Sequence, residues 1–394
     1  MRTKFINGRI LLSDRILHGY SLLVENGRIL GIFNDRAPAS PAADHVIDAA
    51  GRFVSPGFID LHTHGAGGSD FLDCECEGFL TAAATHAKHG TTALLPTATS
   101  GDPEELSDML TVYRAAKAKN TVGAAFLGLH LEGPYFAPSQ KGAQDEKYIR
   151  GFDMEEYTRI LAEGAGDILR WSAAPELEGA CDFARILRAN GVLPSIGHTD
   201  ADSDDVERAF AAGFTHVTHL YSCTSGVHRK NGYRYAGVIE SAYLIDGMTV
   251  EIIADGVHLP ASLLKLVYKI KGADRTALVT DSMRAAGLPE GPSILGSKSR
   301  GLPVIVEDGV AKMPDRSCFA GSVATADRLV RNMVTLAGVP LTDAVKMASA
   351  TPARIIGANS KGSLESGKDA DVILFDDQIR VSLTMVGGNV IFGG

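Results

Sequence analysis

The feature that most constrains the fold is a repeated alternation, through the middle of the chain, between short apolar segments and stretches of helical character. Such alternation is typical of parallel βα units. Eight units favour a closed (β/α)8 TIM barrel over an open doubly wound sheet. Because no Gly-X-Gly-X-X-Gly or Walker-type loop follows the first apolar segment, a nucleotide-binding fold is disfavoured as well.

Each predicted barrel strand ends beside turn-forming residues or beside side chains that are candidates for catalysis or metal binding. Helices are expected between the strands, for example over Glu104 to Lys119, Ala180 to Ala189 and Ser203 to Ala212, the last followed by the stop signal Gly213. The eight strands are expected to end near His62-Thr63-His64, Pro96-Thr97, His130-Leu131-Glu132, Ala174-Pro175-Glu176, Gly197-His198, Thr218-His219, Ala254-Asp255-Gly256 and Thr280-Asp281.

The two ends of the chain have a different character, with short β-like runs separated by Asn-Gly and Gly-Gly turns. We expect residues 1–54 and 359–394 to build one small β-sandwich domain, and residues 55–358 to form the barrel. Within the barrel, residues 295–317 are expected to be an insertion before the last barrel helix. The β-like runs are Lys4 to Ile6, Arg9 to Leu12, Ser21 to Val24, Pro303 to Val306, Ala370 to Phe375, Leu383 to Val386 and Val390 to Phe392.

Composition excludes several classes of function. With 45% hydrophobic and 22% charged residues the chain is typical of a globular protein, and its net charge of -9 offers no basic surface for nucleic acid. No apolar stretch approaches the roughly 18–20 residues of a membrane span, and the first residues lack a signal-peptide core, so a cytoplasmic location is expected. The five cysteines are scattered and predict neither a disulfide framework nor a thiolate metal site.

The first predicted strand ends in His62-Thr63-His64. Residues two apart on a strand share a face, so both imidazoles can reach one metal ion. A His-X-His pair also occurs by chance on strands and loops. It gains weight here because other strand ends carry histidine or carboxylate side chains, and metal coordination is one common explanation for them.

Three of these residues predict a metal site in their own right. Glu132 precedes a Gly-Pro turn, while His198 and His219 stand at two further strand ends. One carboxylate and two imidazoles leave a coordination position for water, as catalytic zinc-type sites do. Salt bridging or capping is the structural alternative for Glu132. His216 falls on the opposite face from His219 and is expected to pack rather than to bind metal.

Two more residues are candidates for chemistry beside this site. Asp281, at the last strand end, is the natural general base, since a carboxylate there can take a proton from water and return it to a leaving group. Its structural alternative is an N-cap for the following turn. His258 follows the seventh strand end and is expected to contact the substrate or to stabilise an oxyanion.

Short motifs spread over nearly the whole chain accompany these residues. They are Pro56-Gly57-Phe58-Ile59-Asp60-Leu61-His62-Thr63-His64, Leu129-His130-Leu131-Glu132-Gly133-Pro134, Lys141-Gly142-Ala143, Gly197-His198-Thr199, Thr218-His219-Leu220-Tyr221, Ala254-Asp255-Gly256-Val257-His258, Thr280-Asp281-Ser282, Ala285-Ala286-Gly287-Leu288-Pro289-Glu290-Gly291 and Phe319-Ala320-Gly321-Ser322.

Together these motifs resemble the amidohydrolase superfamily and, more narrowly, its N-acetylglucosamine-6-phosphate deacetylase family. The resemblance implies a principal divalent metal on Glu132, His198 and His219, with Asp281 as the acid/base and His258 at the sugar phosphate. Since His62 and His64 are both present, it also implies a second ion bridged by Glu132. Zinc is the expected metal, with iron or manganese as alternatives that nitrogen and oxygen ligands also suit.

The chain departs from this family where the substrate phosphate is expected. Ser222 and Cys223 stand where the family usually has Asn-Ala, and Gln144 takes the place of a histidine. The family resemblance implies a homodimer in which an arginine of the partner subunit reaches the phosphate. The corresponding cationic loop carries Arg229 and Arg234, which are therefore candidate substrate-binding residues together with Gln144, Ser222 and Cys223.

The leading hypothesis is a hydrolase acting on a linear amide bond, which removes the N-acetyl group of N-acetylglucosamine 6-phosphate and releases acetate. An enzyme of the same scaffold acting on another N-acyl sugar, phosphorylated or not, or on an N-acyl amino compound is the first alternative. A barrel without catalytic activity is the second, because a fold alone does not establish a function. In each enzymatic case the partner is a small molecule, not nucleic acid or a membrane.

Overall fold

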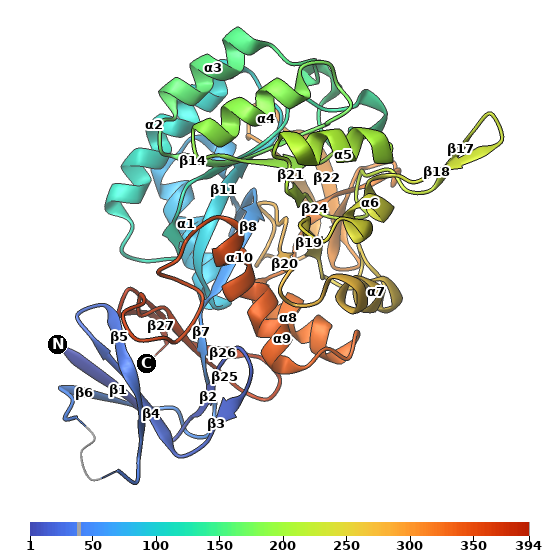
Figure 1. The fold of residues 1–394 in the computed structure, drawn as a ribbon. Helices are drawn as coiled ribbons and strands as arrows, with labels where there is room; N and C mark the ends of the chain where they lie inside the picture. The colour runs from blue at the N-terminus through green and yellow to red at the C-terminus, as the bar shows by residue number, and fades with distance from the viewer. Residues whose placement is uncertain (38–40, 394) are drawn as a thin grey trace.

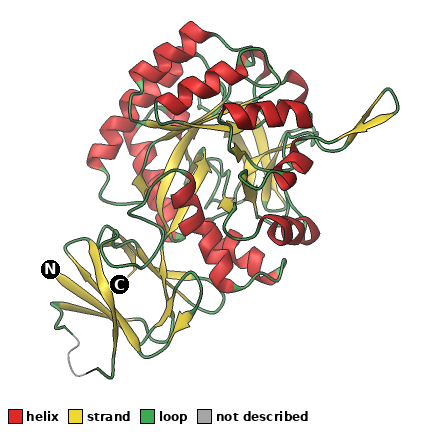
Figure 2. Cartoon of the chain, in the orientation of Figure 1, coloured by secondary structure: helices red, strands yellow, loops and turns green. Residues whose placement is uncertain are grey.

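A computed structural model describes residues 1–37 and 41–393, and parallel strands with helices outside them form the larger part of the molecule (Figures 1 and 2). Each barrel strand pairs in parallel with its neighbour from β8 to β20, which confirms the predicted (β/α)8 barrel. The strands end at or close to the predicted residues. They are β8 (Phe58–Thr63), β11 (Thr91–Ala98), β13 (Leu129–Glu132), β14 (Ile168–Ala173), β15 (Leu193–Ile196), β16 (His216–Val217), β19 (Thr249–Ile253) and β20 (Thr276–Val279).

The barrel closes between β20 and β8 through side-chain contacts and a single parallel bridge from Thr63 to Ser282. The buried carboxylate of Asp60, on β8, is central to this closure. Its Oδ1 accepts hydrogen bonds from the backbone N–H groups of Thr280 (3.2 Å) and His62 (3.3 Å). Its Oδ2 accepts the Thr280 hydroxyl at 2.5 Å. Burial nevertheless raises the pKa of Asp60 to about 6.

The helices cover the outer face of the barrel, and their local sequence explains their limits. Asp202 caps α5 by accepting the N–H groups of Asp204 and Asp205, and the helix stops before Gly213, whose φ is 123°. α4 and α5 have the predicted bounds, and α2 begins one residue before the prediction. The helices are α1 (Cys76–Lys88), α2 (Pro103–Lys119), α3 (Met154–Glu163), α4 (Ala180–Ala189), α5 (Ser203–Ala212), α6 (Val238–Leu244), α7 (Ala261–Lys271), α8 (Ala326–Thr335), α9 (Leu341–Ala348) and α10 (Ala350–Ile355), with 3-10 turns η1 (Phe71–Asp73), η2 (Pro138–Gln140) and η3 (Glu146–Tyr148).

Both chain ends lie in a small β unit beside the barrel, as predicted (Figure 1). One sheet has the order β5-β4-β1-β6 and the other the order β27-β26-β25-β7-β2-β3. Apolar side chains from both sheets, such as Phe5 and Leu22 from the first and Val54 and Leu374 from the second, share one core. The strands are β1 (Arg2–Ile6), β2 (Arg9–Leu11), β3 (Ile16–Leu17), β4 (Tyr20–Glu25), β5 (Arg28–Asn34), β6 (His45–Asp48), β7 (Phe53–Pro56), β25 (Val372–Phe375), β26 (Val381–Val386) and β27 (Asn389–Gly393).

The chain passes from the small unit into the barrel without a linker. β7 pairs with β2 and β25, and a single residue, Gly57, separates it from β8. A Cβ atom at Gly57 would lie 2.2 Å from the side chain of Thr92 on β11, so the close approach of these strands needs glycine. β7 thus spans the boundary predicted between residues 54 and 55, and the division into domains at those residues stays a prediction.

Two β insertions interrupt the βα alternation of the barrel, one after β16 and one after β20. The insertion predicted at residues 295–317 lies within an antiparallel sheet of β21 to β24 that is longer at both ends, from Gly291 to Ser322. Ser322 connects this sheet to the barrel by donating its N–H to the carbonyl of Asp281 at 2.7 Å. A separate hairpin of β17 and β18 projects from the barrel at the right of Figure 1. The remaining strands are β9 (Gly65–Ala66), β10 (Ser69–Asp70), β12 (Ala125–Phe126), β17 (His228–Lys230), β18 (Tyr233–Tyr235), β21 (Gly291–Leu295), β22 (Leu302–Glu307), β23 (Val310–Lys312) and β24 (Phe319–Ser322).

Within residues 1–37 and 41–393, no helix is both long and apolar enough to cross a membrane.

The raised pKa of Asp60 predicts a pH-dependent stability. Between the ordinary pKa of 3.8 and the folded value of about 6, the folded chain holds a proton that the unfolded chain releases, so the free energy of unfolding falls as pH rises through this window. The shift corresponds to about 3 kcal/mol. We expect the free-energy difference between the unaltered protein and Asp60→Asn to change by about 2 kcal/mol of this total from pH 4 to pH 6.5, measured by urea unfolding of metal-free protein. Parallel stability curves for the two proteins would contradict the role of Asp60.

Candidate metal centre and active site

The predicted metal ligands and general base converge at the C-terminal ends of the barrel strands. His64, Glu132, His198, His219 and Asp281 line one cavity of about 560 Å³, and His62 lies directly behind it. These side chains are almost fully buried, since the residues are between 0% and 7% exposed. Strand geometry explains the convergence, because parallel strands of a barrel all direct their carboxyl ends to one face.

Glu132 lies between two pairs of imidazoles. Its Oε1 is 3.2 Å from Nε2 of His198 and 3.1 Å from Nε2 of His219. Its Oε2 is 3.4 Å from Nε2 of His64, and Oε1 is also 3.4 Å from Nε2 of His62. Two groups can therefore hold a metal, each with ligand atoms within 4.8 Å of one another, and both groups include Glu132. This is the arrangement expected for two ions bridged by one carboxylate.

The protonation pattern of the histidines fits a metal. His62 directs Nδ1 at Glu251 (2.9 Å), and His198 directs Nδ1 at the carbonyl of Gln140 (2.8 Å). A neutral imidazole carries one N–H, so donation from Nδ1 leaves the lone pair of Nε2 facing the Glu132 carboxylate. The lone pairs of Nε2 and of the carboxylate repel each other unless a proton or a metal cation lies between them, and a divalent ion can take the place of that proton. Outer hydrogen bonds that fix Nδ1–H in this way are typical of metal-bound histidine.

The electrostatics of the centre also favour a cation. Burial alone would lower the pKa of His62, but the charges of Asp281 and Glu132 outweigh burial and raise it to about 10. In addition, Nδ1 of His64 and Nδ1 of His219 are buried without a hydrogen-bond partner. Nitrogen and oxygen donors around a site of negative potential suit a divalent ion such as zinc, iron or manganese.

Asp281 is placed to act as a base. Its Oδ1 lies 3.2 Å from Nε2 of His64 and 3.4 Å from Nε2 of His62. Burial would raise the pKa of Asp281, but these two histidines hold it below its usual value, so the side chain is a carboxylate at neutral pH. Gly321 packs against its backbone, since a Cβ atom there would lie 3.0 Å from the Asp281 carbonyl oxygen.

A buried ion pair beneath the centre was not identified from sequence. Glu251 on β19 and Arg170 on β14 are both fully buried, and Arg170 Nη1 donates to Glu251 Oε2 at 2.5 Å. Oε1 of the same carboxylate accepts from His62 Nδ1 at 2.9 Å and from the backbone N–H of His219 at 3.2 Å. Glu251 thus orients one ligand of each metal group. A charged residue inside an otherwise apolar strand was the available signal.

His216 contacts the same ion pair and belongs to neither ligand group. Its Nε2 lies 3.3 Å from Oε2 of Glu251, and its Nδ1 lies 2.8 Å from the hydroxyl of Thr249. This position agrees with the packing role predicted for it.

The predicted substrate residues divide into three sets. Ser222, Cys223 and His258 line the cavity. His258 is oriented by Asp255, whose Oδ2 lies 2.8 Å from its Nδ1.

Gln144 also lines the cavity, but both ends of its amide are already used. Its Nε2 donates to Glu132 Oε2 at 2.8 Å, and its Oε1 accepts the N–H of Ser100 at 2.8 Å. Gln144 therefore positions Glu132. The third set, Arg229 and Arg234, lies exposed on the projecting β17–β18 hairpin and outside the cavity lining.

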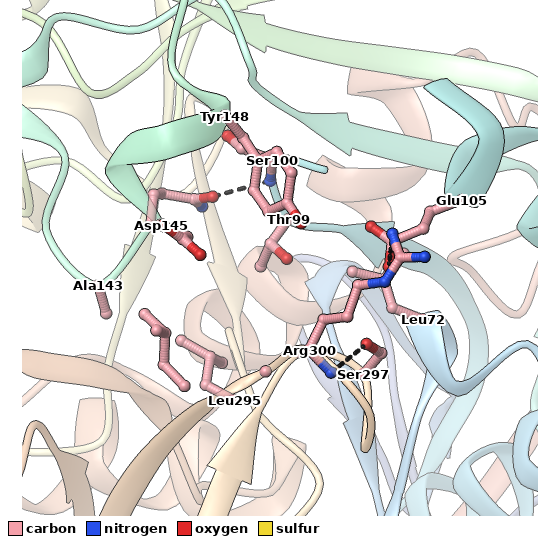
Figure 3. A pocket seen from close by; sticks show the side chains of 14 residues that line it. Leu72, Thr99, Ser100, Glu105, Ala143, Asp145, Tyr148, Leu295, Ser297 and Arg300 are labelled. Carbon is pink, nitrogen blue, oxygen red and sulfur yellow. Dashed lines mark hydrogen bonds and ion pairs between the residues drawn. The ribbon is translucent and has the colours of Figure 1, made fainter. Parts of the chain in front are cut away.

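A smaller pocket adjoins the main cavity (Figure 3). It shares Thr99, Ala143, Gln144 and Leu295 with the cavity and continues to Arg300, which forms an ion pair with Glu105 at 3.3 Å. Its volume is about 30 Å³. This space accommodates water but not a sugar, so the main cavity is the candidate substrate site.

Comparison with known proteins agrees with this geometry. The model of the amidohydrolase family matches residues 53–391. The N-acetylglucosamine-6-phosphate deacetylase of Bacillus subtilis is 33% identical, over 96% of this chain and 94% of its own length. The solved structure of the deacetylase of that name from Pasteurella multocida superposes with a TM-score of 0.91, at 30% identity over 99% of both chains. A mutant of the Mycobacterium smegmatis deacetylase, in complex with N-acetyl-D-glucosamine-6-phosphate, gives a TM-score of 0.89 at 29% identity, covering 100% of this chain and 99% of its own.

Because Glu132 belongs to both ligand groups, we predict two metal sites, of which only one requires the β8 histidines His62 and His64. We expect the double variant His62→Asn, His64→Asn to bind one metal ion fewer per chain than the unaltered protein, because Glu132, His198 and His219 still form the other group. Elemental analysis by mass spectrometry after metal loading measures this.

His86→Asn serves as the control, since His86 is a buried histidine that contacts Thr63 and belongs to neither ligand group. Equal metal content in the unaltered protein and the double variant would refute the two-ion arrangement.

Proposed function

The chain belongs to the amidohydrolase family, and on this premise we propose that it hydrolyses N-acetylglucosamine 6-phosphate to glucosamine 6-phosphate and acetate. The observation that carries the proposal is the buried Glu132–His198–His219 group with Asp281 beside it at the wall of a sugar-sized cavity. Near full-length similarity to deacetylases of this name supports the choice of substrate.

Glu132, His198 and His219 would hold the principal ion, for which zinc is our proposal, and His62 and His64 would hold a second ion with Glu132. When bound, such an ion supplies Lewis-acid polarisation of the amide carbonyl and makes water more acidic. The chain keeps the ligand side chains almost fully buried, which limits their contact with bulk water. Glu251 and Gln144 fix the orientations of His62 and Glu132, which limits the rearrangement that the reaction requires.

Asp281 carries the proton through the reaction. As a carboxylate it accepts a proton from the attacking water while the new C–O bond forms at the acetyl carbon. The same carboxyl then donates this proton to the amide nitrogen as the C–N bond breaks, so the leaving group departs as a neutral amine. An amide nitrogen that left as an anion would be a far poorer leaving group. His258, whose Nδ1 is held by Asp255, presents its other nitrogen to the substrate.

Asp281→Asn is the direct test of this assignment. We expect the rate of acetate release to fall by about 10²- to 10⁴-fold, because the amide cannot accept the proton, while metal content stays the same. Acetate is measured with an enzyme-coupled assay on metal-loaded protein, and elemental analysis is done on the same samples. A near-normal rate for Asp281→Asn would remove Asp281 from the mechanism.

A panel of phosphorylated and unphosphorylated N-acetyl sugars tests the substrate. The alternative that the scaffold acts on another N-acyl compound follows from Ser222 and Gln144, which depart from the family pattern. Equal kcat/KM values for N-acetylglucosamine and for its 6-phosphate would favour that alternative over the sugar phosphate.

We also propose that the protein acts as a homodimer in the cytoplasm, where phosphorylated sugars are retained. The projecting β17–β18 hairpin supports the dimer, because it carries Tyr233 (73% exposed) and follows Val227 (60% exposed). We expect light scattering to give twice the chain mass of 41.6 kDa and the double variant Tyr233→Ser, Val227→Ser to shift toward the monomer. A monomeric unaltered protein at micromolar concentration would contradict the dimer.

A further inference from the structure

Two adjoining pockets lie between the small β unit and the barrel, at the opposite end of the barrel from the metal centre. The first has a volume of about 220 Å³ and the second of about 260 Å³, and both are lined by Lys346 and Ala350. Pro56, in the first pocket, lies two residues before β8, and Asp274, in the second, lies two residues before β20. Since the metal ligands lie at the carboxyl ends of the strands, these pockets belong to the other face of the barrel.

Three segments that are far apart in the sequence form the walls of the two pockets. Residues 11–15 come from the small unit, residues 342–354 from α9 and α10, and residues 358–368 from the connection to β25. α9 and α10 lie on the side of the barrel that faces the small unit (Figure 1). Each pocket alone is smaller than the roughly 300–1,000 Å³ typical of small-molecule sites, whereas the two together reach that range. A ligand that fills both pockets therefore contacts the small unit and the barrel at once.

Apolar side chains form much of the first pocket. Leu11, Val345 and Leu364, which are between 1% and 3% exposed, line it together with Pro56. Ser363 belongs to the same wall, and its hydroxyl is buried without a hydrogen-bond partner among the described residues. A buried hydroxyl that stays unpaired costs free energy, because water no longer solvates it. The first pocket thus offers a ligand apolar contact and one unused hydrogen-bonding group.

The second pocket reverses the charge of the protein as a whole. The chain has 38 basic and 47 acidic residues, whereas the second pocket is lined by four basic side chains and one carboxylate. The basic residues are Lys346, Arg354, Lys361 and Lys368, and the carboxylate belongs to Asp274. A local excess of positive charge on an acidic protein attracts an anion to this place.

Three of these cations are available to a ligand. Lys346 pairs with Asp274 (2.6 Å) and Lys368 with Glu365 (3.4 Å), and the two carboxylate side chains are 73% and 69% exposed. Exposed pairs of this kind contribute little to stability, so a bound anion can take the place of the carboxylate. Arg354 donates to the carbonyl oxygen of Asp274 and forms no ion pair with a carboxylate in residues 1–37 or 41–393.

The other charges around the two pockets are bound to each other. Lys361 pairs with Asp371 (2.7 Å) and Asp369 (3.1 Å), whose side chains are only 4% and 18% exposed, so its role is structural. Asp14 and Arg15, which line the first pocket, pair with each other at 2.8 Å. The positive charge that faces a ligand is therefore concentrated in the second pocket.

We propose that the two pockets bind a small organic phosphate, with its apolar body in the first pocket and its phosphate in the second. Lys346, Arg354 and Lys368 bind the phosphate, because lysine and arginine form strong charge-assisted hydrogen bonds with it. Lys346 lines both pockets and lies where the two parts of the ligand meet. The site is separate from the proposed hydrolysis, since Asp281 lies at the other end of the barrel.

Isothermal titration calorimetry on the metal-loaded full-length protein tests this site. The probe is 1-naphthyl phosphate, which joins an aromatic body to a phosphate group. We expect one binding event per chain whose Kd rises roughly tenfold or more in Lys346→Ala and in Arg354→Ala, and further in the double variant, because charge-assisted hydrogen bonds are lost. Inorganic phosphate and 1-naphthol, the two halves of the probe, are expected to bind more weakly, since each fills only one pocket.

Lys265→Ala is the matched control, since Lys265 is an exposed lysine of α7 that lines neither pocket. Thermal unfolding is a second measurement. A ligand that binds only the folded chain raises its melting temperature, so we expect 1-naphthyl phosphate to raise Tm in the unaltered protein and in Lys265→Ala, and to raise it less in the double variant. Urea unfolding without the probe checks that each variant is folded.

Two results would overturn the inference. One is a failure of the unaltered protein to bind 1-naphthyl phosphate at millimolar concentration. The other is an unchanged Kd in the folded double variant of Lys346 and Arg354, which would place the probe elsewhere, for example in the active-site cavity. Because the experiment does not measure acetate release, neither result bears on the proposed function, and failure of the deacetylase assay would leave this site standing.

Discussion

The buried ion pair between Arg170 and Glu251 is the interaction on which the rest of the centre depends. Two opposite charges on different strands lie inside the barrel, where either one alone would be costly to bury. Arg170 and the hydrogen bonds from His216 and His62 outweigh burial and hold the pKa of Glu251 well below its usual range. The resulting fixed carboxylate orients His62 and the backbone of His219. The buried pair therefore sets the position of one ligand in each metal group.

Several groups of the site are each held by a second residue. Glu132 is held by Gln144, His198 by the carbonyl of Gln140, and His258 by Asp255. Such outer contacts reduce the rearrangement required during the reaction and fix the tautomers of the histidines. Gln144, at a position where the family resemblance led us to expect a histidine, bonds both Glu132 and the backbone N–H of Ser100.

The sequence predicted which candidate site residues lie together better than it predicted the contacts that support them. Strand ends and helix limits follow from local patterns, and Ser203 to Ala212 was predicted to the residue because its cap and stop signals are local. Glu251 and Arg170 were missed because their meaning arises only when β14 and β19 face each other across the barrel interior. Arg229 and Arg234 were favoured because they follow a strand end closely; in the structure they lie on a projecting hairpin, and their part in substrate binding stays a prediction.

The passage from β7 through Gly57 into β8 has a consequence for how this architecture can change. β7 is an inner strand of the six-stranded sheet that joins both chain ends, and β8 carries His62 and His64. Since one residue separates them, the direction of β7 in the small unit constrains the direction in which β8, with His62 and His64, enters the barrel. The small unit is thus not an interchangeable module attached to an independent catalyst. Any recombination or truncation that replaces it also resets the angle at which the first strand enters the barrel.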